Sequence, residues 1–341
     1  MVGILDDACL GLLMSVGYRT GLFEALAELG AATSTEVARA AALDERYVRE
    51  WLGGMVVGSI VEYDPSAGTY TLPREHAAFT TVAAGPDDLA FFTQYLALMG
   101  AIEPEIVRVF REGGGVPPSA YTWFQPLQRA ETARVYDAAL VDTILPLAGG
   151  VVARLRDGID VLDVGTGAGH AVNVMARAFP QSSFVGIDLS DEGIGRARAE
   201  AAAWGLDNVR FEVADAAELT GHFGLITAFD AIHDQAQPTK VLAAISEALA
   251  DDGVFLMGDI AFSSRLEDNI GNPLAATVFG FSVFYCLTVS LAYGGEGLGT
   301  AWGQQLALQK LAEAGFGPPK VSQVEGDPLN MYYVARKSSR R

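Results

Sequence analysis

A His-Asp pair, His233 and Asp234, follows an apolar run that is typical of a β-strand. It lies in the segment FDAIHDQAQP (229–238), and the whole chain contains only four histidines. An imidazole with an ordinary pKa of about 6.5 is largely neutral at cellular pH, so His233 could accept a proton from a substrate. Alternatively, His233 could pack under the loop while Asp234 caps a helix that begins near Pro238.

A second segment, VLDVGTGAGH (161–170), combines an apolar strand with three closely spaced glycines. The strand ends in Asp163 and runs into Gly165, Gly167 and Gly169, where we expect a helix to begin. Glycines let a backbone turn tightly and approach a ligand, and strand ends are where ligands bind in a doubly wound sheet. The spacing is not the G-x-G-x-x-G of a dinucleotide loop, and an acid would repel a pyrophosphate. A cofactor with an amino group suits Asp163 better, which predicts S-adenosylmethionine (SAM).

Two further acids end the next two expected strands. Asp188 follows Asp163 by 25 residues and is placed to accept hydrogen bonds from ribose hydroxyls. Asp215 could accept from the adenine amino group, although an Asp at a strand end is often only a helix cap. We expect the neighbouring residues Thr166, Leu189, Ala216 and Phe229 to contribute to the same cofactor site.

The elements that must position these residues alternate between strand and helix. Strands are predicted at 160–165, 182–190, 208–215, 223–232 and 253–262, and helices at 170–179, 191–205 and 238–250. This alternation predicts an α/β fold with a parallel sheet that is covered by helices on both faces. The segments 319–326 and 330–337 are predicted to close the chain as an antiparallel pair of strands.

The first part of the chain has a different pattern. Residues from Leu5 to Leu29 have helical spacing, which Gly11, Gly17 and Gly21 break into two helices or one bent helix. Next come two short helices, the first capped by Ser34 or Thr35 and the second by Asp44, and a hairpin that turns at 65–68. Helix, turn, helix and hairpin form a winged-helix pattern.

The charge of this winged-helix segment distinguishes DNA binding from a role in dimerisation. Residues 1–80 carry five basic side chains against eleven acidic ones, whereas a DNA-binding helix should be visibly basic. We therefore interpret residues 1–84 as a dimerisation domain. The whole chain has a net charge of −19, which disfavours both nucleic acid and anionic membranes as partners.

The cysteines and the most apolar stretch indicate where the protein works. Cys9 and Cys286 match no metal-binding spacing and no disulfide framework, so we expect no metal and a reducing compartment. The N-terminus lacks the features of a secretory signal, which favours the cytoplasm. The apolar run at 279–293 is shorter than the roughly 20 residues of a membrane span, so we interpret it as a buried helix that lines a pocket.

Aromatic residues gather in two segments beside the expected sheet edge. Residues 85–150 are predicted to form a helical cover, whose Gly- and Pro-rich loop at 111–120 suggests mobility. An insert at 263–303 interrupts the domain of 151–341. The two segments predict an apolar, aromatic wall for a hydrophobic acceptor. The expected substrate contacts are Tyr121, Trp123, Phe124, Phe281, Tyr285 and Trp302.

The whole pattern resembles the class I SAM-dependent methyltransferases, with their Rossmann-like seven-stranded sheet. The winged-helix front and the middle helices are similar to small-molecule O-methyltransferases of the plant type. FDAIHDQAQP together with YCLTVSLAYGGEGLGTAWG (285–303) resembles a bacterial and mycobacterial subfamily. The resemblance implies SAM as cofactor, S-adenosylhomocysteine as product and a small-molecule acceptor.

The resemblance also implies roles at the opening segment. His233 takes the position of the general base, and the family brackets this His with acidic residues. Asp259, at the end of the fifth strand, is the acid that orients it, and the expected catalytic residues are His233, Asp259 and Asp234. Gln235 stands where the plant-type pattern has Trp, so the acceptor's identity does not carry over. O-methylation is the expected reaction. S- or N-methylation, including that of a thioether, a SAM-sensing regulator, and a SAM-binding protein without transfer remain alternatives.

Overall fold

The computed structural model describes residues 1–325 and 327–338. The chain divides into two compact units, Met1–Ala101 and Ile102–Arg341, and the division falls inside helix α6 (Gln94–Glu112). The expected cover segment, 85–150, therefore contributes to both units. Gly326, in the expected closing pair of strands, and residues 339–341 lie outside the described residues.

The first unit has the winged-helix pattern that the sequence predicts. Strands β1 and β2 form an antiparallel hairpin around the turn at 65–68. The elements are α1 (Val2–Arg19), α2 (Leu22–Leu29), α3 (Ser34–Ala40), α4 (Glu45–Val57), β1 (Glu62–Asp64), β2 (Thr69–Thr71) and α5 (Arg74–Thr80). Side chains from α2, α3 and α4 form its core, with Phe23, Leu26 and Leu52 completely buried.

Two local predictions for this unit need correction. Helix α1 continues through Gly11 and Gly17, and the chain breaks only at Gly21, whose φ of 70° a side chain would rarely adopt. The cap of α3 is Thr33, one residue before the predicted pair, because Thr33 and Glu36 form a reciprocal capping box. Asp44 caps α4 as predicted.

The second unit is built on a seven-stranded sheet with the order β5-β4-β3-β6-β7-β9-β8. Strands β3 to β7 are parallel, whereas β9 pairs antiparallel with both β7 and β8. The strands are β3 (Asp160–Val164), β4 (Ser183–Asp188), β5 (Val209–Val213), β6 (Phe223–Phe229), β7 (Leu249–Ile260), β8 (Lys320–Val324) and β9 (Asp327–Ala335). Strand order reverses between β3 and β6, the place where doubly wound folds bind ligands.

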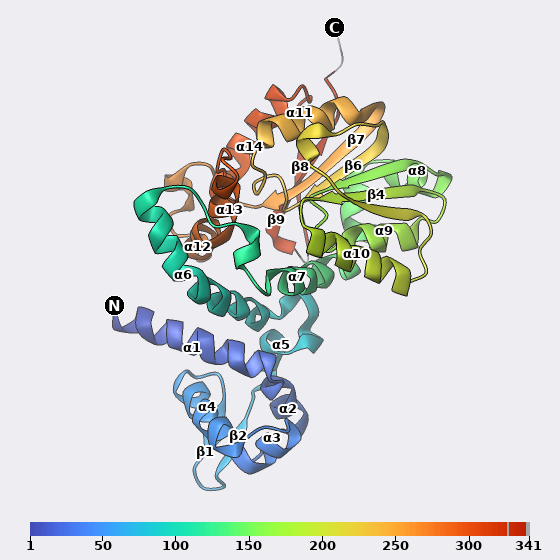
Figure 1. Ribbon diagram of the computed structural model, residues 1–341. Coiled ribbons are helices and arrows are strands. Elements are labelled where there is room, and N and C mark those ends of the chain that lie inside the picture. The colour runs from blue at the N-terminus through green and yellow to red at the C-terminus, as the bar shows by residue number, and fades with distance from the viewer. Residues whose placement is uncertain (326, 339–341) are drawn as a thin grey trace. The chain divides into compact units, whose positions relative to one another are not determined.

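Helices cover both faces of this sheet (Figure 1). Neighbouring strand residues alternate between the faces, so Val161 packs into one core and Leu162 into the other. One core includes side chains of α8 (Val151–Asp157), α9 (His170–Ala178) and α10 (Asp191–Ala203). The other includes α11 (Pro238–Ala248) and α14 (Gly303–Glu313). The predicted α/β architecture is confirmed.

The segments that flank the sheet edge are helical. Helix α7 (Phe124–Ala139) precedes the sheet, and the later insert holds α12 (Ala275–Phe281), a π-helical turn η8 (Ser282–Cys286) and α13 (Leu287–Ala292). The Gly- and Pro-rich loop before α7 is anchored, because the buried Val116 donates its N–H to the Thr288 hydroxyl at 2.8 Å.

Candidate active site

The glycine loop between β3 and α9 has the conformation that its sequence requires. Gly165, Gly167 and Gly169 all have positive φ, between 54° and 74°. A Cβ at Gly165 would lie 2.5 Å from the Ala231 Cβ, and one at Gly169 would lie 2.4 Å from the Ala197 Cβ. Both glycines are therefore fixed by packing as well as by φ. The contact with Ala231 also places the loop that carries His233 directly against the glycine loop.

Asp188 fastens this loop from the neighbouring strand. One carboxylate oxygen accepts the Gly167 N–H at 2.8 Å, and the other accepts the Ser190 N–H at the same distance. Burial raises the pKa of Asp188, and these backbone hydrogen bonds oppose the shift. Asp188 thus lies at the sheet edge where the sequence predicts it.

The other two acids of the predicted cofactor site differ from each other. Asp163 is buried and accepts the Thr227 hydroxyl at 2.5 Å, and burial raises its pKa to about 7. Asp215 is exposed and accepts the Ala217 N–H at 2.8 Å, so it caps a short 3-10 turn. Among their neighbours, Leu189 is exposed, Ala216 is buried, and the Phe229 ring packs against Tyr136.

His233 and Asp259 form a buried pair between the ends of β6 and β7. The His233 Nδ1 lies 2.8 Å from the Asp259 Oδ1. The same carboxylate oxygen accepts the Trp302 indole N–H at 2.9 Å and the Ile260 N–H at 2.9 Å. The carboxylate is therefore held in place, and its bond to Nδ1 leaves Nε2 as the nitrogen available for chemistry.

The Nε2 atom faces two other side chains. It lies 3.4 Å from the Asp234 Oδ1, and Cys286 completes a group whose polar atoms lie within 4.8 Å of one another. Burial disfavours the imidazolium, but the charges of Asp259 and Asp234 outweigh it and hold the pKa of His233 well above its ordinary value. These two carboxylates therefore favour the imidazolium of His233 more than solvent does for an ordinary imidazole. Asp234 is not the cap of α11, because that position belongs to Gln237.

An aromatic cluster of Tyr121, Phe124 and Tyr285 lies beside this group. Phe124 and Tyr285 are stacked with ring centroids 3.7 Å apart, and Tyr121 meets Tyr285 edge-on at 4.9 Å. The Tyr121 hydroxyl donates to the Phe284 carbonyl at 2.5 Å. Burial, followed by the charge of Asp234, raises the pKa of Tyr285 well above its ordinary value, which ties the cluster to the His233 loop.

The other predicted wall residues have mixed positions. Trp302 is buried and orients Asp259, so its polar atom is already committed within the protein. Trp123 and Phe281 are partly buried, and Tyr293, which adjoins the expected wall, is 58% exposed. Among the predicted wall residues, Tyr121, Phe124 and Tyr285 form the cluster described above.

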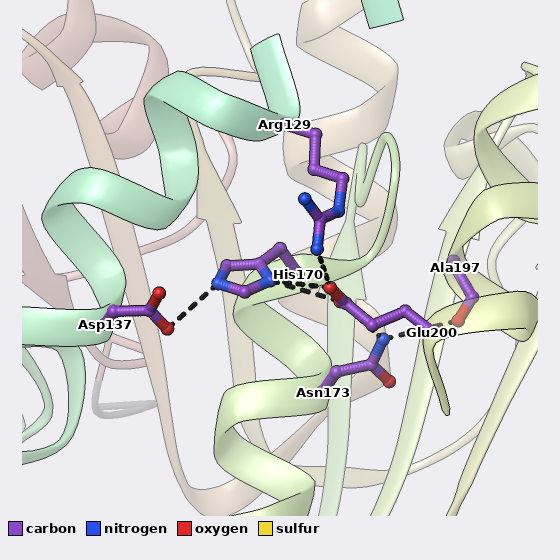
Figure 2. Close-up of polar contacts among 6 residues, drawn as sticks. All are labelled: Arg129, Asp137, His170, Asn173, Ala197 and Glu200. Carbon is purple, nitrogen blue, oxygen red and sulfur yellow. Dashed lines mark hydrogen bonds and ion pairs between the residues drawn. The ribbon is translucent and has the colours of Figure 1, made fainter. Parts of the chain in front are cut away.

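Helix α7, which begins at Phe124, is fastened to the sheet domain by a polar network that the sequence does not reveal (Figure 2). The His170 Nε2 lies 3.0 Å from an Asp137 oxygen, and its Nδ1 lies 3.1 Å from Glu200. Arg129 and Asn173 also bond to Glu200. The network joins α7 to α9 and α10. Burial opposes ionisation of Glu200, but bonds from His170, Asn173 and Arg129 lower its pKa to about 2.

Two residues near His233 were missed by sequence reasoning. Cys286 comes from η8, more than fifty positions away in the chain, so no local spacing could reveal it. Asp230 has a φ of 51°, which is unusual for a residue with a side chain, and its pKa is raised well above the ordinary value by burial and the charge of Asp259. Residues with a strained backbone are found preferentially at functional sites.

The apolar helix of the insert is longer than its sequence suggests. Residues 275–292 form 18 helical residues with a mean hydropathy of 1.8, and 39% of them are buried inside the protein. Within the described part of the chain, this helix is long and apolar enough to cross a membrane by length and composition alone. It carries Tyr285 and Cys286, which face the site described above.

Two family models match separate parts of this chain. A family model described as the Rv2258c-like winged HTH domain matches residues 8–82, and one described as a methyltransferase domain matches residues 155–313. Trans-aconitate 2-methyltransferase from Deinococcus radiodurans is 31% identical over 128 residues, which cover 36% of this chain. The match spans 48% of that relative's length.

Solved structures share the fold along nearly the whole chain. The human N-acetylserotonin methyltransferase in complex with SAM superposes with a TM-score of 0.72 at 15% identity and covers 98% of this chain and 96% of its own. PigF with S-adenosylhomocysteine gives a TM-score of 0.70 at 18% identity and covers 98% of each chain. Residues 8–82 are therefore similar to Rv2258c-like winged helix-turn-helix domains and residues 155–313 to methyltransferase domains, and the mostly parallel sheet of the second unit has a Rossmann-like reversal of strand order.

Proposed function

We propose that this protein is a SAM-dependent methyltransferase that acts on a small-molecule acceptor, with O-methylation as its reaction. The observation that carries the proposal is the packing of Gly165 against Ala231. That contact joins the glycine loop to the loop in which His233 pairs with Asp259. The loop proposed to hold the cofactor and the residue proposed to accept the proton thus lie side by side at the edge where strand order reverses.

The residues around the glycine loop fit SAM chemically. The acids Asp163 and Asp188 lie at the carboxyl ends of adjacent parallel strands, where an amino group and a ribose would find acceptors. In helix α7, the buried Gln125 Oε1 has no hydrogen-bond partner among the described residues, and it lies 3.4 Å from a Cβ built at Gly193. The bound sulfonium supplies an electrophilic methyl group. The residues proposed to hold the cofactor are Asp163, Gly165, Thr166, Gly167, Gly169, Asp188, Leu189, Asp215, Ala216 and Phe229.

His233 is proposed to take the acceptor's proton at Nε2. Asp259 fixes the opposite nitrogen, which orients the ring and stabilises the imidazolium that forms. The charges of Asp259 and Asp234 raise the pKa of His233 in the free protein, and the positive charge of a nearby sulfonium would lower it again. A positioned base of this kind typically contributes about 10² to 10⁴ in rate.

The acceptor is proposed to bind against the aromatic cluster. Phe124 and Tyr285 offer stacked apolar faces, while Asp234 and His233 supply the polar end. An apolar pocket with few polar groups suits a hydrophobic or aromatic metabolite. Trp123 and Phe281 are proposed to extend this wall, and Trp302 to support Asp259.

We further propose that the protein works in the cytoplasm as a homodimer, without nucleic acid or membrane as partner. Helix α1 exposes several large apolar side chains, among them Leu5, Leu12 and Val16, which a second copy would cover. The acidic winged-helix domain supports pairing rather than DNA binding. A gel shift at low salt tests the DNA-binding alternative.

The experiment that tests the function is a labelled-methyl screen with SAM against phenols, carboxylic acids, amines and thioethers. Transfer to a phenol or acid that is lost in His233→Ala supports O-methylation with His233 as base. Transfer to a thioether that survives in His233→Ala would replace that reaction with S-methylation, because a thioether has no proton to lose.

A further inference from the structure

We propose that His233, Asp234 and Cys286 form a three-ligand site for Zn²⁺ or a similar transition-metal ion. The three side chains come from the loop after β6 and from the π-helical turn η8. One atom of each, a ring nitrogen, a carboxylate oxygen and Sγ, lies within 4.8 Å of the other two. Nitrogen, oxygen and sulfur together are the ligand types that Zn²⁺ takes in proteins.

The spacing is close to that of a tetrahedral metal site. The His233 Nε2 and the Asp234 Oδ1 are 3.4 Å apart. Zinc bonds of about 2.0 to 2.2 Å to nitrogen and oxygen place two tetrahedral ligands roughly 3.3 Å from each other. Bonds of about 2.3 Å to sulfur and about 2.0 Å to nitrogen place two tetrahedral ligands roughly 3.5 Å apart, so the Cys286 Sγ needs to approach the other two atoms by about 1.3 Å at most.

The second layer of the site is already formed. Metal-binding histidines donate their other ring N–H to a carboxylate or carbonyl, which fixes the tautomer and the ring orientation. Asp259 does this for His233 at 2.8 Å, and Trp302 in turn holds the same carboxylate oxygen at 2.9 Å. The Nε2 lone pair is thereby aimed at Asp234 and Cys286.

Charge balance favours a cation at this position. The Cys286 side chain and the His233 ring are buried, and the Asp234 Oδ1 has no hydrogen-bond partner among the described residues. A carboxylate, a thiolate and a divalent cation sum to zero. When the metal binds, the thiol proton of Cys286 and the proton on the His233 Nε2 both leave to solvent.

Metal binding has a consequence for the proposed reaction. The metal would occupy Nε2 of His233, the same atom that is proposed to accept the acceptor's proton. Zinc therefore inhibits methyl transfer to acceptors that need the base. This consequence rests on the proposed function, whereas the metal site does not, so binding is measured without SAM or acceptor.

The test is a titration of the full chain with Co²⁺, which reports thiolate ligation by a near-ultraviolet charge-transfer band, followed by displacement with Zn²⁺. The chain offers a matched pair of variants because it has only two cysteines, the buried Cys286 and the exposed Cys9. We expect one equivalent of Co²⁺ with the band in wild type and Cys9→Ser. Cys286→Ser should lose the band and at least about 100-fold in affinity, more than the loss of an outer-layer partner.

A band that persists in Cys286→Ser or vanishes in Cys9→Ser would overturn the proposal, as would the absence of any stoichiometric binding. Zinc-edge X-ray absorption of the wild type, with one equivalent of Zn²⁺, needs no variant to fold. We expect one sulfur at about 2.3 Å and nitrogen or oxygen at about 2.0 Å. A zinc shell without sulfur means an adventitious ion only. Inhibition by Zn²⁺, reversed by a chelator, is then measured separately.

Discussion

The His233 Nδ1 lies 2.8 Å from the Asp259 Oδ1, and this contact joins residues from the ends of neighbouring parallel strands. Asp259 is almost completely buried, and its second oxygen, Oδ2, has no hydrogen-bond partner within the described residues. The contact with His233 and the hydrogen bonds from the Trp302 indole and the Ile260 N–H therefore compensate for burying this acid. The arrangement orients the imidazole at the edge where the glycine loop also lies.

Removing either partner should slow the proposed reaction. We expect His233→Ala to lower kcat for a hydroxyl acceptor by about 10² to 10⁴, and Asp259→Asn to lower it by a smaller factor. Affinity for S-adenosylhomocysteine should be unchanged in both, since neither residue belongs to the glycine loop. Steady-state kinetics beside calorimetry check this. Equal loss of cofactor affinity and of kcat would assign the pair a structural role instead.

Asp163 should make the free protein less stable as the pH rises. Its folded pKa of about 7 lies above the ordinary value of 3.8. Folding therefore favours the protonated form of Asp163. Its contribution to the free energy of unfolding is fully present below about pH 4 and is lost as the pH rises through 7. Asp163→Asn keeps an acceptor for the Thr227 hydroxyl and should stabilise the protein above pH 7 by up to about 4 kcal/mol. Urea unfolding at pH 4 and 8 checks this, and equal stabilisation at both pH values would contradict it.

Glu200 should contribute stability with the opposite dependence on pH. Its folded pKa is about 2, below the ordinary value of 4.5, so its contribution is present above about pH 4.5 and lost as the pH falls towards 2. Glu200→Gln should destabilise the protein at pH 7 and bring its stability closer to that of the wild type near pH 3. Thermal unfolding across this range measures the difference. Glu192→Gln, on the exposed face of α10, serves as the control.

The exposed face of α1 should govern the oligomeric state. Leu5 is 70% exposed and Leu12 is 45% exposed. The two residues lie on the same face of α1, about two turns apart. We expect the wild type to be a dimer by light scattering and the double variant Leu5→Asp, Leu12→Asp to be a monomer. Val57→Asp, at an 86% exposed apolar residue of α4, should remain dimeric. A monomeric wild type, or a double variant that stays dimeric, would exclude pairing through α1.

The sequence predicts the fold well because its signals are local. Alternating strands and helices, the glycine spacing and the acids at strand ends lie within short windows, and the sheet follows from them. The pairing of His233 with Asp259 came from the family resemblance together with the position of each residue at a strand end.

Other features depend on contacts between distant segments. Cys286 meets His233 only because the insert brings η8 next to the loop after β6, and Arg129 meets Glu200 only because α7 and α10 both pack on α9. The pKa of His233 also depends on the burial of its ring and on the charges of both Asp259 and Asp234. Composition and spacing do not encode these distances.

The most direct test of the central claim is calorimetric titration of S-adenosylhomocysteine into the wild type, Asp188→Ala and the control Asp191→Ala. Asp188 accepts the Gly167 and Ser190 N–H groups, whereas Asp191 is exposed at the start of α10. We predict micromolar binding to the wild type and to Asp191→Ala, and at least tenfold weaker binding, about 1.4 kcal/mol, to a folded Asp188→Ala. No binding to the wild type, or equal binding to all three, would contradict the assignment of the glycine loop as the cofactor site.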